Sequence, residues 1–166
     1  MGGLEMSPPT VLDMPGPMHR ITPVARLAST KAVQLWEGIS RAHNAMAAAI
    51  EKDMLPETGI ALSWYEVLAH LNRAPNEMLR FQDLARVAGL TDSGVSRRLN
   101  QMIKAGLVDR HTCPTDGRGV YAHLTDKGKA AYTKAHAVFL RSLHRNLDNF
   151  EPGEAEAVNT ALSRLS

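Results

Sequence analysis

Small polar and basic side chains gather in one stretch of the second half of the chain, where their spacing is suited to contacting DNA. Arginine can donate two hydrogen bonds to guanine O6 and N7, asparagine can pair in the same way with adenine N6 and N7, and serine or glycine lets a helix approach base edges closely. The candidate DNA-contacting residues of this stretch are Thr91, Ser93, Gly94, Ser96, Arg97, Asn100 and Lys104. These residue types favour reading of a major groove.

A second candidate contact is a basic tip further along the chain. Asp116 and Arg118 lie between Pro114 and Gly119. An arginine inserted into a narrow minor groove is stabilised by the enhanced negative potential there, and it reads groove shape more than base identity. Alternatively, Arg118 pairs with Asp116 to hold the tip. Both roles are compatible, because an exposed ion pair contributes only about 0 to 1 kcal/mol.

The elements that must position these residues follow from the apolar spacing. Residues 82–88 predict a short helix that packs Leu84, Ala85 and Val87 and stops at Gly89, which accepts left-handed backbone geometry. Thr91 is expected to cap the next helix. The inward side of that helix is predicted to carry Val95, Leu99, Met102 and Ile103. Because each residue turns a helix by roughly 100°, the candidate contacts then face outward.

Two strands are predicted after this helix, at residues 108–112 and 120–124, because their side chains alternate with a period of two. The glycines between them indicate a hairpin. An exposed polar helix face is usually just solvated. A short preceding helix, a glycine turn and a following basic hairpin favour DNA contact instead, since together they describe a winged helix-turn-helix.

The remaining helices are predicted to be apolar on one side. Residues 29–54 carry such a stripe, Ser63 and Glu66 are expected to form a capping pair on the next helix, and two further helices are expected from Thr125 and from Pro152. Their uncovered faces predict a homodimer. The expected fold class is mainly α with a small β-hairpin wing: a winged helix-turn-helix lobe at about residues 62–124, plus dimerisation helices at about 29–54 and 125–166.

Composition sets outer limits on these interpretations. The 166 residues suit one domain at 29–166, and the first 28 residues hold five of the nine prolines, so they are expected to form a flexible arm. A net charge of +2 is too mild to identify a partner. The single cysteine excludes an internal disulfide. Without a long apolar run or a secretory signal, we expect a cytoplasmic protein that does not enter a membrane.

The hairpin and its flanks resemble the MarR family of transcriptional regulators. The matching elements are Gly106-Leu107-Val108-Asp109-Arg110, then Pro114-Thr115-Asp116-Gly117-Arg118, then Leu124-Thr125 with Gly128. They are similar to the family's GLV-x-R, P-x-D-R-R and L-T-x-x-G elements at the same spacing, and the resemblance runs from about residue 30 to the end.

This resemblance implies a dimer, joined through its first and last two helices, that binds palindromic operator DNA as double strands. The positions that match the family's DNA contacts are Ser93, Ser96, Arg97, Asn100, Asp116 and Arg118. Gly117 replaces the first of the two wing arginines, so we expect weaker phosphate attraction and a slightly shallower salt dependence.

The resemblance also implies a repressor that releases DNA when a small aromatic or anionic effector binds. The first two helices offer candidate pocket residues, namely Trp36, His43, Met46, Trp64 and His70. At helical spacing, however, such residues more often belong to a core. The chain lacks a phosphate-binding glycine loop, an H-E-x-x-H pair and a nucleophile elbow, so no enzyme activity and no cofactor are expected.

Two further interpretations stay open. A winged helix can dock on protein or RNA, and Cys113 at the base of the wing could make the protein a redox-responsive regulator, although the chain has no second cysteine to resolve an oxidised thiol. His111 and His123 are expected to face each other across the hairpin, and His136 and His144 lie two turns apart. Without a compact ligand signature, no metal site is predicted.

Overall fold

The structure is a computed structural model that describes residues 23–112, 119–151 and 153–165, with side chains from residue 30 onward. The chain divides into two compact units, Met1–Ser40 and Arg41–Ser166. The first unit contributes the beginning of a long helix. All the predicted DNA-contacting residues belong to the second unit.

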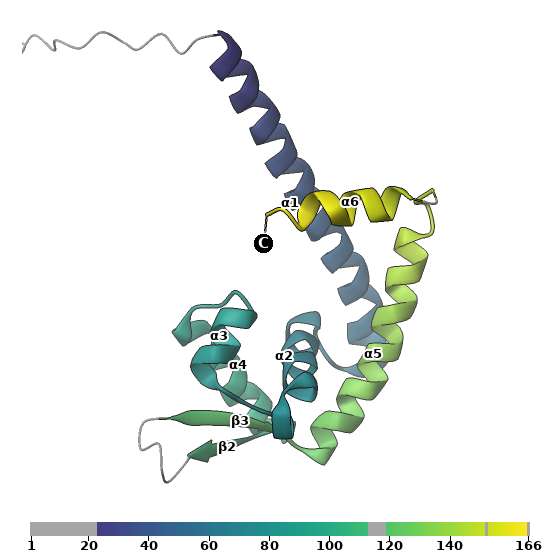
Figure 1. Cartoon of the computed structure of the whole chain (residues 1–166). Coiled ribbons are helices and arrows are strands. Elements are labelled where there is room, and N and C mark those ends of the chain that lie inside the picture. Colours follow the sequence, from purple (N-terminus) through teal and green to yellow (C-terminus); the bar gives the residue numbers. More distant parts are fainter. Residues whose placement is uncertain (1–22, 113–118, 152, 166) are drawn as a thin grey trace, which may run out of the picture. The chain divides into compact units, whose positions relative to one another are not determined.

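The described residues are mostly helical, with one small antiparallel sheet (Figure 1). The helices are α1 (Pro23–Thr58), α2 (Leu62–Arg73), α3 (Phe81–Val87), α4 (Asp92–Lys104), α5 (Asp126–Leu147) and α6 (Glu154–Leu162), and η1 (Pro75–Glu77) is a 3-10 turn. The strands are β1 (Met78–Arg80), β2 (Val108–Thr112) and β3 (Val120–Leu124). The expected fold class, mainly α with a small β wing, is confirmed.

The ends of α1 and α2 differ from the prediction. Helix α1 begins at Pro23, ahead of residue 29, and ends at Thr58, after which Gly59 has a φ of 72°. The predicted capping pair of Ser63 and Glu66 is wrong, because α2 begins at Leu62 and its N-cap residue Ala61 makes no side-chain cap hydrogen bond. The carboxylate of Glu51 supplies the acceptor instead, taking a 2.5 Å hydrogen bond from the Leu62 N–H.

The sheet contains the two predicted strands at their predicted bounds and a third strand that was not predicted. The strand order is β1-β3-β2, with Met78 opposite His123 and Val108 opposite Leu124. One face points into the core, where Val108, Ala122 and Leu124 are fully buried. Because side chains alternate along a strand, His123 belongs to the other face.

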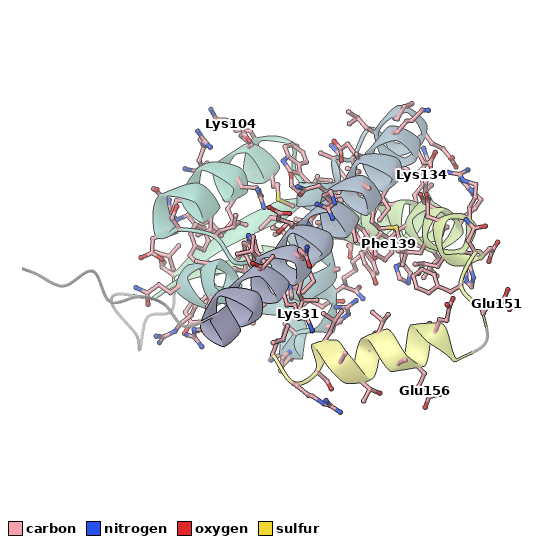
Figure 2. The ribbon with its side chains drawn as sticks, turned by 90° about the horizontal axis from the view of Figure 1, so that it is seen from above. Lys31, Lys104, Lys134, Phe139, Glu151 and Glu156 are labelled. Atoms are coloured by element: carbon pink, nitrogen blue, oxygen red, sulfur yellow. The ribbon has the colours of Figure 1, made fainter. Side chains whose placement is uncertain are left out.

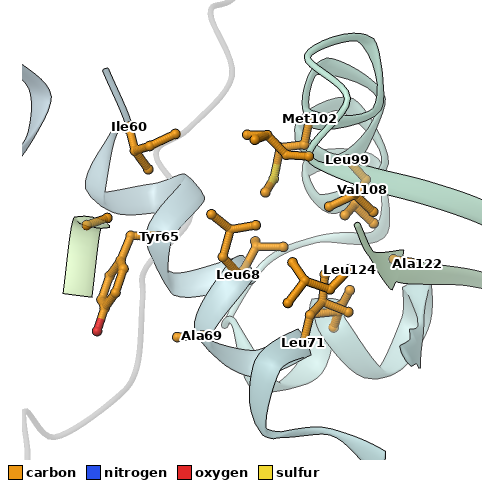
Figure 3. Packing of buried hydrophobic residues seen from close by; sticks show 14 of the residues in the cluster. Ile60, Tyr65, Leu68, Ala69, Leu71, Leu99, Met102, Val108, Ala122 and Leu124 are labelled. Atoms are coloured by element: carbon orange, nitrogen blue, oxygen red, sulfur yellow. The ribbon is translucent and has the colours of Figure 1, made fainter. Parts of the chain in front are cut away.

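The core of the second unit forms where α2, α3 and α4 meet the sheet and α5 (Figure 3). Its fully buried side chains include Leu68, Leu71, Leu84, Leu99, Met102 and Leu124. Burying each such side chain contributes roughly 1.5–3 kcal/mol, an upper estimate. The prediction that Val87 packs inward is wrong, since Val87 is 51% exposed. The inward stripe of the seven-residue α3 consists of Phe81, Leu84 and Ala85, and Val87 falls outside it.

Helix α2 covers the first part of the apolar stripe on α5, and the rest of the stripe stays uncovered by the described residues. The Tyr65 ring lies 5.8 Å from the Tyr132 ring and 4.6 Å from the Phe139 ring, centroid to centroid. Leu147, further along α5, remains 42% exposed. The end of the stripe therefore still lacks a partner within the described chain.

Candidate nucleic-acid interface

Helix α4 begins with a side-chain N-cap. Thr91 is the N-cap residue, and its Oγ1 accepts a 3.1 Å hydrogen bond from the Gly94 N–H. Asp92 in the first turn favours the positive end of the helix dipole. A Cβ at Gly94 would lie 3.0 Å from Thr91 Oγ1, so glycine leaves room for the cap. Two of the predicted contact residues thus also shape the start of the helix.

The core determines which side of α4 faces outward. Val95, Leu99 and Met102 are 1% exposed or less, as predicted. On the opposite side Ser93, Arg97, Asn100 and Lys104 are exposed, and Ser96 is half-buried. Lys104 extends outward from the last turn of the helix (Figure 2). The predicted orientation of the helix is therefore confirmed.

The guanidinium of Arg97 has no hydrogen bond or ion pair within the part of the chain that the structure describes. Arg86 on α3 differs, because its Nη2 lies 2.6 Å from the Asp83 carboxylate. Five N–H donors of Arg97 are thus exposed on the outer face of α4, which is the state required for bidentate base recognition.

The base of the wing carries two arginines that the sequence analysis did not propose as contact residues. Arg80 Nε donates a 2.7 Å hydrogen bond to the Tyr121 hydroxyl, which links β1 to β3. The Arg110 guanidinium lies over the Phe81 ring, 5.5 Å from its centroid. Arg80 was missed because β1 is too short to show an alternating pattern. The predicted tip residues Asp116 and Arg118, as well as Gly117 and Cys113, lie outside the described residues.

A cavity of about 250 Å³ lies beside the first turns of α4. It is lined by residues from α3, α4 and the sheet: Arg80, Phe81, Gln82, Asp92, Val95, Ser96, Arg110, Gly119 and Val120. Two guanidinium groups and the single carboxylate of Asp92 give the lining a net positive charge, while Phe81, Val95 and Val120 offer apolar surface. The arrangement suits a small ligand with an apolar body and a negative group.

The five predicted effector-binding residues are found elsewhere. Met46 and Trp64 pack, partly buried, against the core, and His70 is half-buried on α2. His43 is exposed beside Asn44, with 3.4 Å between its Nδ1 and Asn44 Oδ1. Trp36 is 70% exposed and belongs to the first unit. None of the five lines the cavity beside α4.

The resolved pKa shifts lie at structural contacts away from the outer face of α4. The 2.6 Å hydrogen bond from the Ser142 hydroxyl, together with the charge of Arg145, lowers the pKa of the Asp53 carboxyl. Burial raises the pKa of Tyr65 to about 12. The ion pair with Glu77, at 2.7 Å, raises the pKa of Lys129. These groups connect α5 to other elements and stabilise the frame behind α4.

The predicted approach of His111 and His123 across the hairpin is confirmed, since their ring centroids lie 5.3 Å apart. None of the helices among the described residues could span a lipid bilayer.

Comparisons with known proteins identify the family. A family model described as "MarR family" matches residues 58–119. The HTH-type transcriptional regulator TcaR of Staphylococcus aureus (strain Newman) is 31% identical over 119 residues, which cover 70% of this chain and 76% of TcaR.

Solved structures agree with this match. AbsC, a MarR family transcriptional regulator from Streptomyces coelicolor, superposes with a TM-score of 0.73 at 26% identity, covering 87% of this chain and 93% of AbsC. Sco3205 is a MarR family regulator from the same organism and was crystallised in complex with DNA. It superposes with a TM-score of 0.73 at 23% identity, covering 80% of this chain and 84% of the Sco3205 chain. These relatives are regulators rather than enzymes, and the chain belongs to the MarR family of transcriptional regulators.

Proposed function

We propose that this regulator binds duplex DNA by placing the outer face of α4 in a major groove. The observation that carries the proposal is the outward Arg97 guanidinium, which has no partner among the described residues, on a helix whose opposite side is buried in the core. Ser93, Ser96 and Asn100 flank it with short hydrogen-bonding side chains, and Lys104 extends the face toward the DNA backbone. Sco3205, a MarR family regulator of similar fold, was crystallised in complex with DNA, which supports DNA binding by this fold.

We further propose that the protein acts as a homodimeric repressor on a palindromic operator. The second unit presents exposed apolar side chains on its last two helices, and a two-fold partner is the commonest way to cover such a surface. These side chains are Leu140, Leu147, Val158 and Leu162. Two copies of α4 then read two symmetric sites. The sequence predictions that Arg118 enters the adjacent minor groove and that Asp116 is a further DNA-contact position of the wing are part of this proposal.

Release from DNA is proposed to follow binding of a small aromatic or anionic effector. The cavity beside α4 supports this step, because Ser96 belongs both to the cavity lining and to the proposed contact face. A ligand held by Arg80 and Arg110 would therefore adjoin the residues that meet DNA. The alternative effector site is the one predicted from the sequence, which consists of Trp36, His43, Met46, Trp64 and His70.

The test compares two substitutions on α4 with one on α5. DNA sites are first selected from a random duplex library with the wild-type protein, and affinities are then measured at several salt concentrations. We expect Arg97→Ala to weaken binding by about 1–3 kcal/mol and to relax selectivity at one base position. Lys104→Ala should weaken binding to all sequences alike and lower the salt slope by about 1.

The matched control is Lys134→Ala, which removes an exposed charge from α5 (Figure 2). It should leave both affinity and selectivity at the wild-type level. Unchanged affinity of Arg97→Ala would reject the role of α4. Failure of the wild-type protein to select any duplex sequence would favour the alternative of a protein- or RNA-binding winged helix.

A further inference from the structure

Three side chains with metal-binding atoms meet on the outer face of the wing. Asp109 and His111 are two residues apart on β2, and His123 on β3 is the register partner of Asp109. Side chains two apart on a strand, and side chains directly opposite each other, share one face of a sheet. One ligand atom from each of the three lies within 4.8 Å of the other two.

The three side chains extend from strands whose other face is buried in the core, and they are accessible to solvent. These strands bury Val108, Ala122 and Leu124 completely on their other face, so the backbone is held by the core. Asp109 and His111 are exposed and His123 is half-buried. The two imidazole rings meet edge to face, with an interplanar angle of 79°.

The ligand atoms of these three side chains are free of other polar contacts among the described residues. Within the described ranges, none of these three side chains forms a hydrogen bond or an ion pair. Such polar groups, gathered on one face without partners, keep their lone pairs available for an ion. The sequence predicted the approach of the two histidines but no metal, because the contribution of Asp109 depends on the register between β2 and β3.

The donor set selects the class of ion. Two imidazole nitrogens and one carboxylate oxygen suit Zn²⁺ and its transition-metal neighbours, whereas Mg²⁺ and Ca²⁺ require oxygen ligands throughout. Ligands of a tetrahedral zinc ion at 2.0–2.2 Å lie about 3.3–3.6 Å apart. The side chains of Asp109 and His111 are exposed, so they would rotate on ion binding to close the remaining gap. We propose that Asp109, His111 and His123 bind Zn²⁺ on the outer face of the wing, with water completing the coordination.

The bound ion would connect β2 to β3 just before the tip that is proposed to contact DNA. It would stabilise the hairpin and add positive charge to the wing, so we expect zinc to raise the affinity for DNA. This regulatory consequence rests on the proposed function. Ion binding itself does not, because it depends on the sheet alone.

The experiment measures ion binding without DNA. The full-length chain carries Cys113→Ser, which removes thiol coordination, and Co²⁺ serves as the spectroscopic probe, followed by displacement with Zn²⁺. With Co²⁺ we expect visible d–d absorption that saturates at one equivalent, and with diamagnetic Zn²⁺ we expect shifted NMR signals for His111 and His123. Signals of His19, His43, His70, His136 and His144 should not move.

Two variants and one control locate the site. Asp109→Asn and His111→Asn should each weaken metal binding by about tenfold or more. Even substitution of residues that only hydrogen-bond to a metal's ligands typically lowers metal affinity about 10–100-fold. His144→Asn alters an exposed histidine on α5 and should bind as wild type does. Zinc should raise the unfolding temperature of the wild-type and control proteins much more than that of the two variants.

Two results would overturn the site: a cobalt spectrum that persists unchanged in His111→Asn, or unshifted signals of His111 and His123 at one equivalent. DNA affinity is then compared with zinc and with a chelator. Equal affinity in the two conditions would reject the regulatory consequence and leave the ion site standing. Absence of DNA binding in both would reject the proposed function instead.

Discussion

At the scale of single residues, Tyr65 shows how the fold controls a titratable group. Its ring is 3% exposed and stacks on Tyr132 with an interplanar angle of 5°. Its hydroxyl shares a 2.8 Å hydrogen bond with Nδ1 of His136. Burial disfavours the phenolate and raises the pKa from 10.0 to about 12.

This shift predicts a loss of stability at alkaline pH. A folded-state pKa above the unfolded one means that stability is fully present below pH 10.0 and is lost as pH rises toward about 12. Urea unfolding across this range should show a decrease in the free energy of unfolding of roughly 2 kcal/mol. Tyr65→Phe should remove most of this decrease. A variant with the same alkaline slope as the wild type would contradict the assignment to Tyr65.

At the scale of elements, the end of α4 is tied to the start of α5. The Thr125 hydroxyl accepts a 2.9 Å hydrogen bond from the Gly128 N–H and donates one of 2.8 Å to the Gly106 carbonyl. Lys127 Nζ donates a 2.7 Å hydrogen bond to the Ala105 carbonyl. The N-cap and first turn of α5 thus satisfy the carbonyl groups of the two residues that directly follow α4.

Gly128 is needed at this junction because the backbone passes too close for a side chain. A Cβ there would lie 2.1 Å from the Leu107 carbonyl oxygen. We expect Gly128→Ala to lower the free energy of unfolding by about 1–3 kcal/mol, measured by urea titration. Gly38→Ala is the matched control, since a Cβ at Gly38 meets nothing within 4 Å. The control should gain about 0.5–1 kcal/mol. Equal stability of the two variants would reject the proposed clash.

The sequence predicted those elements whose side chains follow a clear period. The bounds of β2 and β3 and the inward face of α4 were correct because alternation and helical spacing are strong over five or more residues. Elements that depend on distant contacts were not predictable in this way. The cap of α2 comes from Glu51, and β1 exists as a strand because β3 lies beside it.

In the candidate site, too, only the features that depend on a single segment of the sequence could be predicted. The orientation of Arg97 and Asn100 follows from the buried positions on their own helix, so sequence reasoning reached it. The cavity forms only where α3, α4 and the sheet meet. The proposed ion site of Asp109, His111 and His123 depends on the register between β2 and β3. Neither arrangement exists within a single segment of sequence.

At the scale of the whole molecule, the last two helices present an apolar surface to solvent. None of the residues of α6 with described side chains is buried. Val158 and Leu162 are 46% and 40% exposed, and their spacing of four puts them on one side of that helix. Phe150, just before α6, is 43% exposed. A surface of this kind is expected to be covered by a second copy.

Sedimentation should therefore give a mass about twice that of the 18.1 kDa chain at micromolar concentration. Replacing both apolar residues, Val158→Asp with Leu162→Asp, should yield monomers, because a carboxylate buried in an apolar interface is not compensated. Asn159→Asp adds a negative charge to the same helix and should leave the dimer intact. A wild-type monomer, or a double variant that still dimerises, would reject this interface.

The junction between α4 and α5 has a consequence for the choice of target. Thr125 and Lys127 hold the end of α4, so α4 cannot rotate freely about the start of α5. In a dimer that forms through α5, this junction would set the distance between the two copies of α4. Successive half-sites on one side of a duplex recur about every 10–10.5 base pairs. Removing the contacts of Thr125 and Lys127 would therefore broaden the range of half-site spacings that the regulator accepts. Each half-site would still be contacted by the same side chains of α4.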